Sequence, residues 1–141
     1  MGTGDSDYSL GFLLTKSARL VQKRYEERLQ RFGITPQQSG ILAIIGSANG
    51  ISPADIVPMM HSDKATISSM LSRLEKQDLI EFQKSPTDGR ARILRLTKAG
   101  RKLLPEVQRI DKAISDELAE KLSASDSRAV KKFLLALYRS S

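Results

Sequence analysis

The sequence has 141 residues, of which 28% are charged, and carries a formal net charge of +7 at pH 7. It contains no cysteine, which excludes disulfides, thiolate metal sites and thiol-based redox sensing. No apolar run approaches the roughly 18 residues that cross a bilayer, and the acidic N-terminus lacks the basic start of a signal peptide. We therefore expect a single-domain, cytoplasmic protein whose basic balance favours an anionic partner.

Two long amphipathic patterns open the chain. Apolar residues recur every three or four positions over residues 8–32, which predicts a helix that Gly33 ends. Residues 35–38, Thr-Pro-Gln-Gln, then supply an N-cap, a proline for the first helical position and a glutamine that can close a capping box. A second helix should therefore run from there to residues 46–50.

Two further helices are predicted close together. Ser52 caps a short helix, which Pro58 should kink or limit to about two turns because proline lacks the backbone donor. Ser62 and Asp63 offer the next N-cap. The helix that follows carries one apolar stripe with i, i+3, i+4, i+7 spacing, made of Ile67, Met70, Leu71 and Leu74.

The opposite side of that helix is small, polar and weakly basic, so it can approach another surface closely. Its residues, with their neighbours on either flank, are Lys64, Ala65, Thr66, Ser68, Ser69, Ser72, Arg73 and Lys76. The major groove of DNA, about 12 Å wide, admits one helix of this kind.

A basic β-hairpin comes next. Residues 79–84 and 91–96 alternate between apolar and polar side chains, and residues 85–89 have turn chemistry. From residue 82 to residue 102 the chain has seven basic residues and one acid, Asp88. A long helix from Thr97 through Leu122 and a last helix from Ser123 to Tyr138 complete the chain.

This order of helix, short helix, helix and hairpin is typical of a winged helix-turn-helix, a mainly α fold with a small hairpin wing. Within it, Asp88-Gly89-Arg90 is followed by Leu96-Thr97 and Gly100. On these residues and on the helix-turn-helix stretch 51–82, the sequence closely resembles the MarR family of transcriptional regulators. The resemblance runs from the first helix to the last.

The resemblance implies a DNA-binding lobe over residues 35–100 and dimerisation helices over residues 8–32 and 103–141. It implies that Arg90 enters the minor groove from the wing tip, while Asp88 holds the wing through a charged hydrogen bond to its arginine neighbour. The helices outside the lobe also carry more apolar residues than a small winged domain needs, namely Leu10, Phe12, Leu13, Leu118, Leu122, Phe133, Leu134 and Leu137. We therefore expect a homodimer that represses transcription from a near-palindromic operator.

The predicted DNA-binding residues come from the slim helix face and from the wing. They are Lys64, Ala65, Thr66, Ser68, Ser69, Ser72, Arg73, Lys76, Lys84, Asp88, Arg90 and Arg92. Because serine contacts either donor or acceptor base edges, much of the specificity is expected from groove shape.

The resemblance also implies a small aromatic or phenolic effector, such as an aromatic acid, held between the dimer helices and the DNA-binding lobe. Arg19 is the cation that it places nearest to this crevice. We expect no cofactor and no metal site, because His61 is the only histidine and a lone imidazole makes a poor site.

Two other functions compete with DNA binding. A winged helix can instead serve as a protein–protein interaction module that never binds DNA. An enzyme is disfavoured, because the sequence has no serine-histidine-acid spacing and no glycine-rich phosphate loop.

Overall fold

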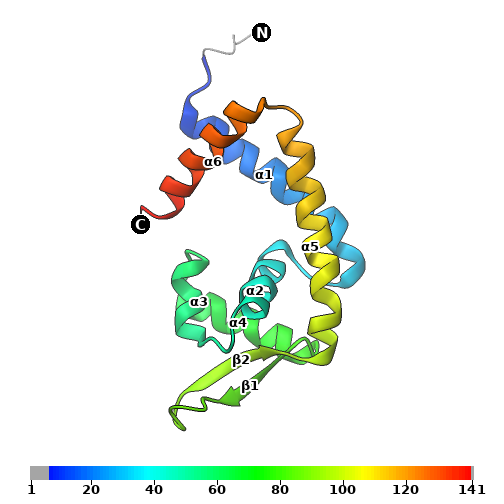
Figure 1. Cartoon of the computed structure of the whole chain (residues 1–141), viewed down its shortest axis with the longest axis vertical. Helices are drawn as coiled ribbons and strands as arrows, with labels where there is room; N and C mark the ends of the chain where they lie inside the picture. The colour runs from blue at the N-terminus through cyan, green and yellow to red at the C-terminus, as the bar shows by residue number, and fades with distance from the viewer. Residues whose placement is uncertain (1–6, 141) are drawn as a thin grey trace.

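The computed structural model describes residues 7–140, which fold into helices with one β-hairpin (Figure 1). The elements are α1 (Leu10–Leu29), a 3-10 turn η2 (Gln30–Phe32), α2 (Pro36–Ser47), α3 (Pro53–Met59), α4 (Lys64–Lys76), β1 (Ile80–Lys84), β2 (Arg92–Leu96), α5 (Lys98–Ala119) and α6 (Ala124–Tyr138). The predicted fold class, mainly α with a small hairpin wing, is confirmed. Residues 1–6, on which the expectation about a signal peptide partly depends, lie outside the described range.

Each helix begins where a short polar side chain accepts a hydrogen bond from the backbone N–H three residues ahead. This cap satisfies one of the donors that the first turn leaves unpaired. At α2 and α3 the cap is reciprocal, because the Gln38 and Asp55 side chains also bond back to the cap residue. The six N-cap residues are Ser9, Thr35, Ser52, Asp63, Thr97 and Ser123.

Pro58 shortens α3 as expected. The helix has seven residues and ends one residue after Pro58, so its missing donor falls in the last turn. The chain then reverses through His61, whose φ of 48° is in the left-handed region. The backbone donors of this turn remain paired, since His61 N bonds to Pro58 O at 3.1 Å and Ser62 N to Val57 O at 3.2 Å.

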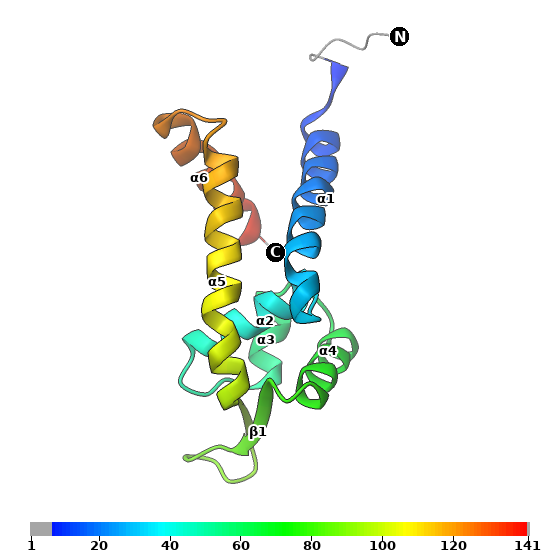
Figure 2. The same ribbon diagram turned by 90° about the vertical axis from the view of Figure 1, so that its right-hand side faces the viewer.

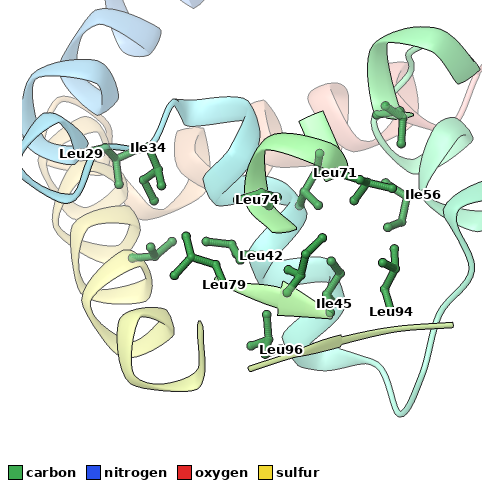
Figure 3. Close-up of a cluster of buried hydrophobic side chains, with 14 of the residues drawn as sticks. Leu29, Ile34, Leu42, Ile45, Ile56, Leu71, Leu74, Leu79, Leu94 and Leu96 are labelled. Carbon is green, nitrogen blue, oxygen red and sulfur yellow. The ribbon is translucent and has the colours of Figure 1, made fainter. Parts of the chain in front are cut away.

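The hydrophobic core lies where α2 meets α4, the hairpin and α5 (Figure 3). Leu42 and Ile45 of α2 are buried together with Leu71 and Leu74 of α4 and with Leu94 of β2. Burying one such side chain stabilises a fold by roughly 1.5–3 kcal/mol. Helix α4 and the hairpin are therefore fixed to one packed block.

The hairpin is antiparallel and is anchored beyond its own two strands. Ile80 pairs with Leu96, and Phe82 pairs with Leu94. Leu94 also donates its backbone N–H to the carbonyl of Ile51 at 2.7 Å, in an isolated bridge. The wing is thus tied to the segment that precedes α3.

Three helices form the other end of the molecule. Helices α1 and α5 run side by side (Figures 1 and 2). They are joined by a hydrogen bond from Tyr25 to Asp111 and by Arg28, whose Nη2 donates to both carboxylate oxygens of Glu117 at 2.7 and 2.6 Å. Helix α6 returns beside them but buries none of its residues in this chain. No helix among residues 7–140 is both long and apolar enough to cross a membrane.

The apolar residues predicted for a dimer interface are mostly exposed in the single chain. Leu118 is the exception, since it is half-buried. The others retain 38–63% of their accessible surface and are Leu10, Phe12, Leu13, Leu122, Phe133, Leu134 and Leu137. We call these seven residues the apolar face of α1 and α6; Leu122 belongs to the loop that joins α5 to α6.

Candidate nucleic-acid interface

Helix α4 presents its predicted polar side to solvent. It packs on α3 and β1 through Ile67, Leu71 and Leu74, which are all buried. Seven of the eight residues predicted for its DNA-binding face are exposed, namely Lys64, Ala65, Ser68, Ser69, Ser72, Arg73 and Lys76. The structure therefore places these seven side chains together on one accessible surface.

The eighth residue, Thr66, takes part in capping the helix. The Asp63 carboxylate accepts from the Thr66 backbone N–H at 2.7 Å and from the Thr66 hydroxyl at 2.9 Å. These bonds, the backbone one first, hold the pKa of Asp63 below its ordinary value. Thr66 is half-buried, and its hydroxyl already serves the start of α4.

The wing turn is organised by Ser85 and Asp88. The Ser85 hydroxyl accepts from the backbone of Thr87 and of Asp88, each at 3.3 Å. The Asp88 carboxylate accepts from the backbone N–H of Arg90 at 3.1 Å. The expected bond between Asp88 and its arginine neighbour therefore exists, but it is made to the backbone of Arg90 and not to the guanidinium.

The backbone partner changes the role that we assign to Asp88. Asp88 shapes the turn, as aspartate does in many turns by bonding to the backbone two residues ahead. Arg90 is exposed, and among residues 7–140 the ion pairs are Arg28–Glu117, Arg109–Glu106 and Lys112–Asp116. The Arg90 guanidinium is therefore available to an anionic partner.

Two cations face each other on the wing. Lys84 is the cross-strand partner of Arg92 in the hairpin register. Like charges in directly opposite positions destabilise a hairpin, and Arg92 is placed by stacking 4.5 Å from the centroid of the Phe82 ring. The repulsion between Lys84 and Arg92 would be relieved by a bound anion such as a DNA phosphate.

Other basic residues of the segment are committed to the fold. Arg95 donates to the Asn49 side chain at 3.0 Å, and Arg101 donates to the Leu96 carbonyl at 2.8 Å. Not every basic residue between positions 82 and 102 is therefore available to an anionic partner. Arg90 and Arg92 extend from the wing itself.

A glutamine relay fixes the far end of α4 and was not predicted from the sequence. The buried Gln38 side chain donates to the Gln77 amide oxygen at 3.1 Å, and the Gln77 amide donates to the Gly33 carbonyl at 2.8 Å. Gln77 is the C-cap of α4. The sequence indicates the capping role of Gln38, but no local signal indicates a partner 39 residues away.

A pocket of about 550 Å³ lies between the helical end and the winged-helix part of the chain. Its lining is mostly apolar, with four uncharged polar side chains, and consists of Leu14, Ser17, Ala18, Val21, Gln22, Tyr25, Pro36, Gln37, Met60, Leu118 and Leu134. Arg19 is exposed on α1 and is not among the described residues that line the pocket. Its predicted contact with an effector stays a prediction.

Tyr25 is the polar group of this pocket with a perturbed ionisation. Partial burial, and then its hydrogen bond to the Asp111 carboxylate, raise the pKa of Tyr25 to about 12. The phenol therefore stays protonated at neutral pH. Among residues 7–140, no group of three or more histidines or carboxylates is arranged to hold a metal ion.

A family model described as the MarR family matches residues 32–91 of the chain. The HTH-type transcriptional regulator MgrA of Staphylococcus aureus is 27% identical over 117 residues, which cover 82% of this chain and 77% of MgrA. Both matches include the helix-turn-helix and the first part of the wing.

Solved structures agree over nearly the whole chain. The crystal structure of MarR has a TM-score of 0.80 at 26% identity, covering 96% of this chain and 92% of MarR. The repressor CouR bound to a 23-mer DNA duplex has a TM-score of 0.87 at 24% identity and 99% coverage of both chains. CouR from Rhodococcus jostii RHA1 bound to p-coumaroyl-CoA has a TM-score of 0.87 at 20% identity, covering 99% and 98%.

The related proteins are transcriptional regulators and not enzymes, in agreement with the prediction from the sequence. The family model, the relatives and the winged helix-turn-helix geometry agree with one another. Together these comparisons support a winged-helix regulator of the MarR family.

Proposed function

We propose that this protein is a DNA-binding repressor that occupies a near-palindromic operator as a homodimer and leaves it when a small effector binds. The observation that carries the proposal is the shared position of two surfaces. Helix α4 and the wing both lie at the end of the molecule away from α6 and the start of α1 (Figures 1 and 2). The polar residues of α4 and Arg90 of the wing turn are exposed. One face of a DNA duplex can meet both.

The two surfaces suit different parts of DNA. The small residues of α4, such as Ala65, Ser69 and Ser72, let the helix approach base edges in the major groove. Arg90 suits the adjacent minor groove, whose negative potential attracts a guanidinium. CouR, which has the same fold, was solved bound to a 23-mer DNA duplex, and this supports DNA binding by the fold.

The apolar face of α1 and α6 supports a homodimer. Water-exposed apolar side chains gathered on adjacent elements mark an interaction surface. A two-fold axis between two copies would set the recognition helices about 34 Å apart, one turn of DNA. An operator with matching half-sites follows from that symmetry.

The pocket lined by Tyr25 is the proposed effector site. It has the size and the mostly apolar lining of small-molecule sites. The Gln37 amide can bond to a hydroxyl or carbonyl, and the Tyr25 oxygen, whose proton is donated to Asp111, can accept from a hydroxyl. A small aromatic or phenolic compound suits this chemistry. The complex of CouR with p-coumaroyl-CoA, in the same fold, supports a ligand-responsive protein.

Selection from random duplex DNA, followed by affinity measurements over a range of salt, tests the proposal. The wild type should select a near-palindrome, and the logarithm of its affinity should fall steeply with the logarithm of salt. Arg90→Ala should weaken binding by at least about tenfold and make the salt dependence shallower. Arg128→Ala, which removes the same charge from α6, is the control.

Each result separates this function from a protein-interaction module. A module of that kind would show no preference for duplex DNA at low salt, and Arg90→Ala and Arg128→Ala would behave alike. Loss of DNA binding in Arg90→Ala with an unchanged subunit number supports the repressor. If light scattering shows the wild type to be a monomer, the proposal of a homodimer on a near-palindromic operator is wrong.

A further inference from the structure

The last turn of α6 contacts the turn of the helix-turn-helix. The Tyr138 hydroxyl donates to the backbone carbonyl of Met59 at 2.6 Å, and the Tyr138 ring meets the His61 imidazole edge to face, with centroids 4.7 Å apart at 70°. Figure 1 shows the C-terminal end of α6 directly above α3. We call these two contacts the Tyr138 latch.

The latch closes on a segment that sets the position of the recognition helix. Met59 is the last residue of α3, and Asp63, four residues later, is the N-cap of α4. Between them, His61 has a backbone conformation that residues other than glycine rarely adopt unless their surroundings hold it. A contact that fixes Met59 and His61 therefore restrains where α4 begins.

The same turn borders the pocket. Met60, between the two residues that Tyr138 contacts, lines the pocket, and so does Leu134, one helical turn before Tyr138 on α6. An occupant of the pocket would touch both the element that carries the latch and the segment that receives it. Helix α6 buries no residue within the chain, so inside one subunit the latch is a main restraint on its last turn.

We propose that Tyr138 is a positioning residue, whose latch holds the helix-turn-helix in the arrangement that binds DNA. When the pocket is occupied, Leu134 moves away from Met60 and the latch opens. This inference rests on the proposed repressor function. It assigns to α6 a role in addition to the apolar face that it offers to a second subunit. Because the latch orders the turn before DNA binds, the free energy of DNA binding is not reduced by the cost of ordering it.

The single histidine of the sequence gives a direct readout of the latch in the intact 141-residue chain, without DNA. NMR of the imidazole protons should show a ring-current shift in the wild type. Tyr138→Leu should move these signals toward those of a free histidine, whereas Tyr138→Phe should largely keep them. Ser140→Ala, which removes a hydroxyl that bonds only within the helix end, to Leu137 O, should leave them unchanged.

DNA affinity tests the positioning role. Tyr138→Phe keeps the ring and loses the hydrogen bond, so operator binding should weaken by about threefold to tenfold, with an unchanged salt slope because no phosphate contact is lost. Affinity within twofold of the wild type, or dissociation of Tyr138→Phe into monomers, would overturn the proposal. Ser140→Ala should bind as the wild type does.

A substitution that fills the pocket replaces the unidentified effector. Ala18→Trp places a large side chain in the lining and should shift the His61 signals in the same direction as Tyr138→Leu. The loss of DNA affinity in Ala18→Trp and in Tyr138→Phe should not be additive in the double variant, since both act through one contact. Unmoved His61 signals, or fully additive losses, would rule out transmission through the latch.

These experiments keep the two proposals apart. If the wild type binds no duplex, the repressor function fails, while the NMR comparison still decides whether the latch exists. If the wild type binds DNA and Tyr138→Leu leaves the imidazole signals in place, the latch alone fails.

Discussion

Gly100 lies directly against the backbone carbonyl of Leu79. A Cβ at Gly100 would stand 2.1 Å from Leu79 O, which is backbone and cannot swing away. Thr97 completes the junction, since it donates its N–H to Leu79 O at 3.1 Å and its hydroxyl to Asp78 O at 2.6 Å. The first turn of α5 is thereby docked on the chain between α4 and the wing, which gives the Leu96-Thr97…Gly100 motif a physical reason.

Gly100→Ala should destabilise the protein by about 1–3 kcal/mol, because the added methyl group forces the α5 start away from Leu79. The measurement is the free energy of unfolding in urea. Gly89→Ala is the matched control, since a Cβ there meets nothing within 4 Å and Gly89 does not have a positive φ. Equal urea midpoints for the two variants would contradict the close approach.

The apolar face of α1 and α6 yields a prediction about assembly. Phe133 is 42% exposed in the single chain, so Phe133→Asp removes little packing within it. If the face is covered by a second subunit, the substitution buries a charge at each side of the interface and should weaken the dimer by about 2–4 kcal/mol. Light scattering over a dilution series measures this change.

Arg128→Glu, an equally drastic change on the same helix, should leave the dimer intact. Both variants keep the Ser123 cap of α6. A Phe133→Asp protein that stays dimeric at the dilution where the wild type does would show that Phe133 lies outside the interface.

Local chemistry explains why so much of the fold could be predicted from the sequence. The helix starts at Thr35, Ser52, Asp63 and Thr97 each depend on residues within three positions. The buried stripe of α4 follows from its spacing alone. Each of these features depends only on residues close together in the chain, so a single sequence is enough to predict it.

The contacts that complete the site join distant parts of the chain. Gln38 reaches Gln77 across 39 positions, and Tyr138 reaches Met59 across 79. The register of helix packing decides such pairs, and no local pattern encodes it. The role of Asp88 shows a further limit, because a sequence indicates that an acid precedes an arginine but not whether its partner is the guanidinium or the backbone.

The ionisation of Tyr25 yields a prediction about pH. The folded chain holds the phenol proton more tightly than an unfolded chain does, because the pKa of Tyr25 is about 12 and its ordinary value is 10.0. The stabilising contribution of Tyr25 is therefore complete below pH 10 and is lost as the pH rises toward 12. Ultraviolet absorbance of the phenolate during an alkaline titration follows this group, and Tyr25→Phe identifies its part of the signal.

Asp111→Asn separates the causes of the shift. Burial is the larger cause and remains in this variant, whereas the carboxylate that accepts from the phenol and opposes its negative charge is removed. The Tyr25 transition should then move to lower pH without reaching the ordinary value, and the alkaline loss of stability should begin earlier. A transition that does not move would show that Asp111 does not bear on the phenol, and that the α1–α5 contact beside the pocket is held by packing and by the Arg28–Glu117 pair.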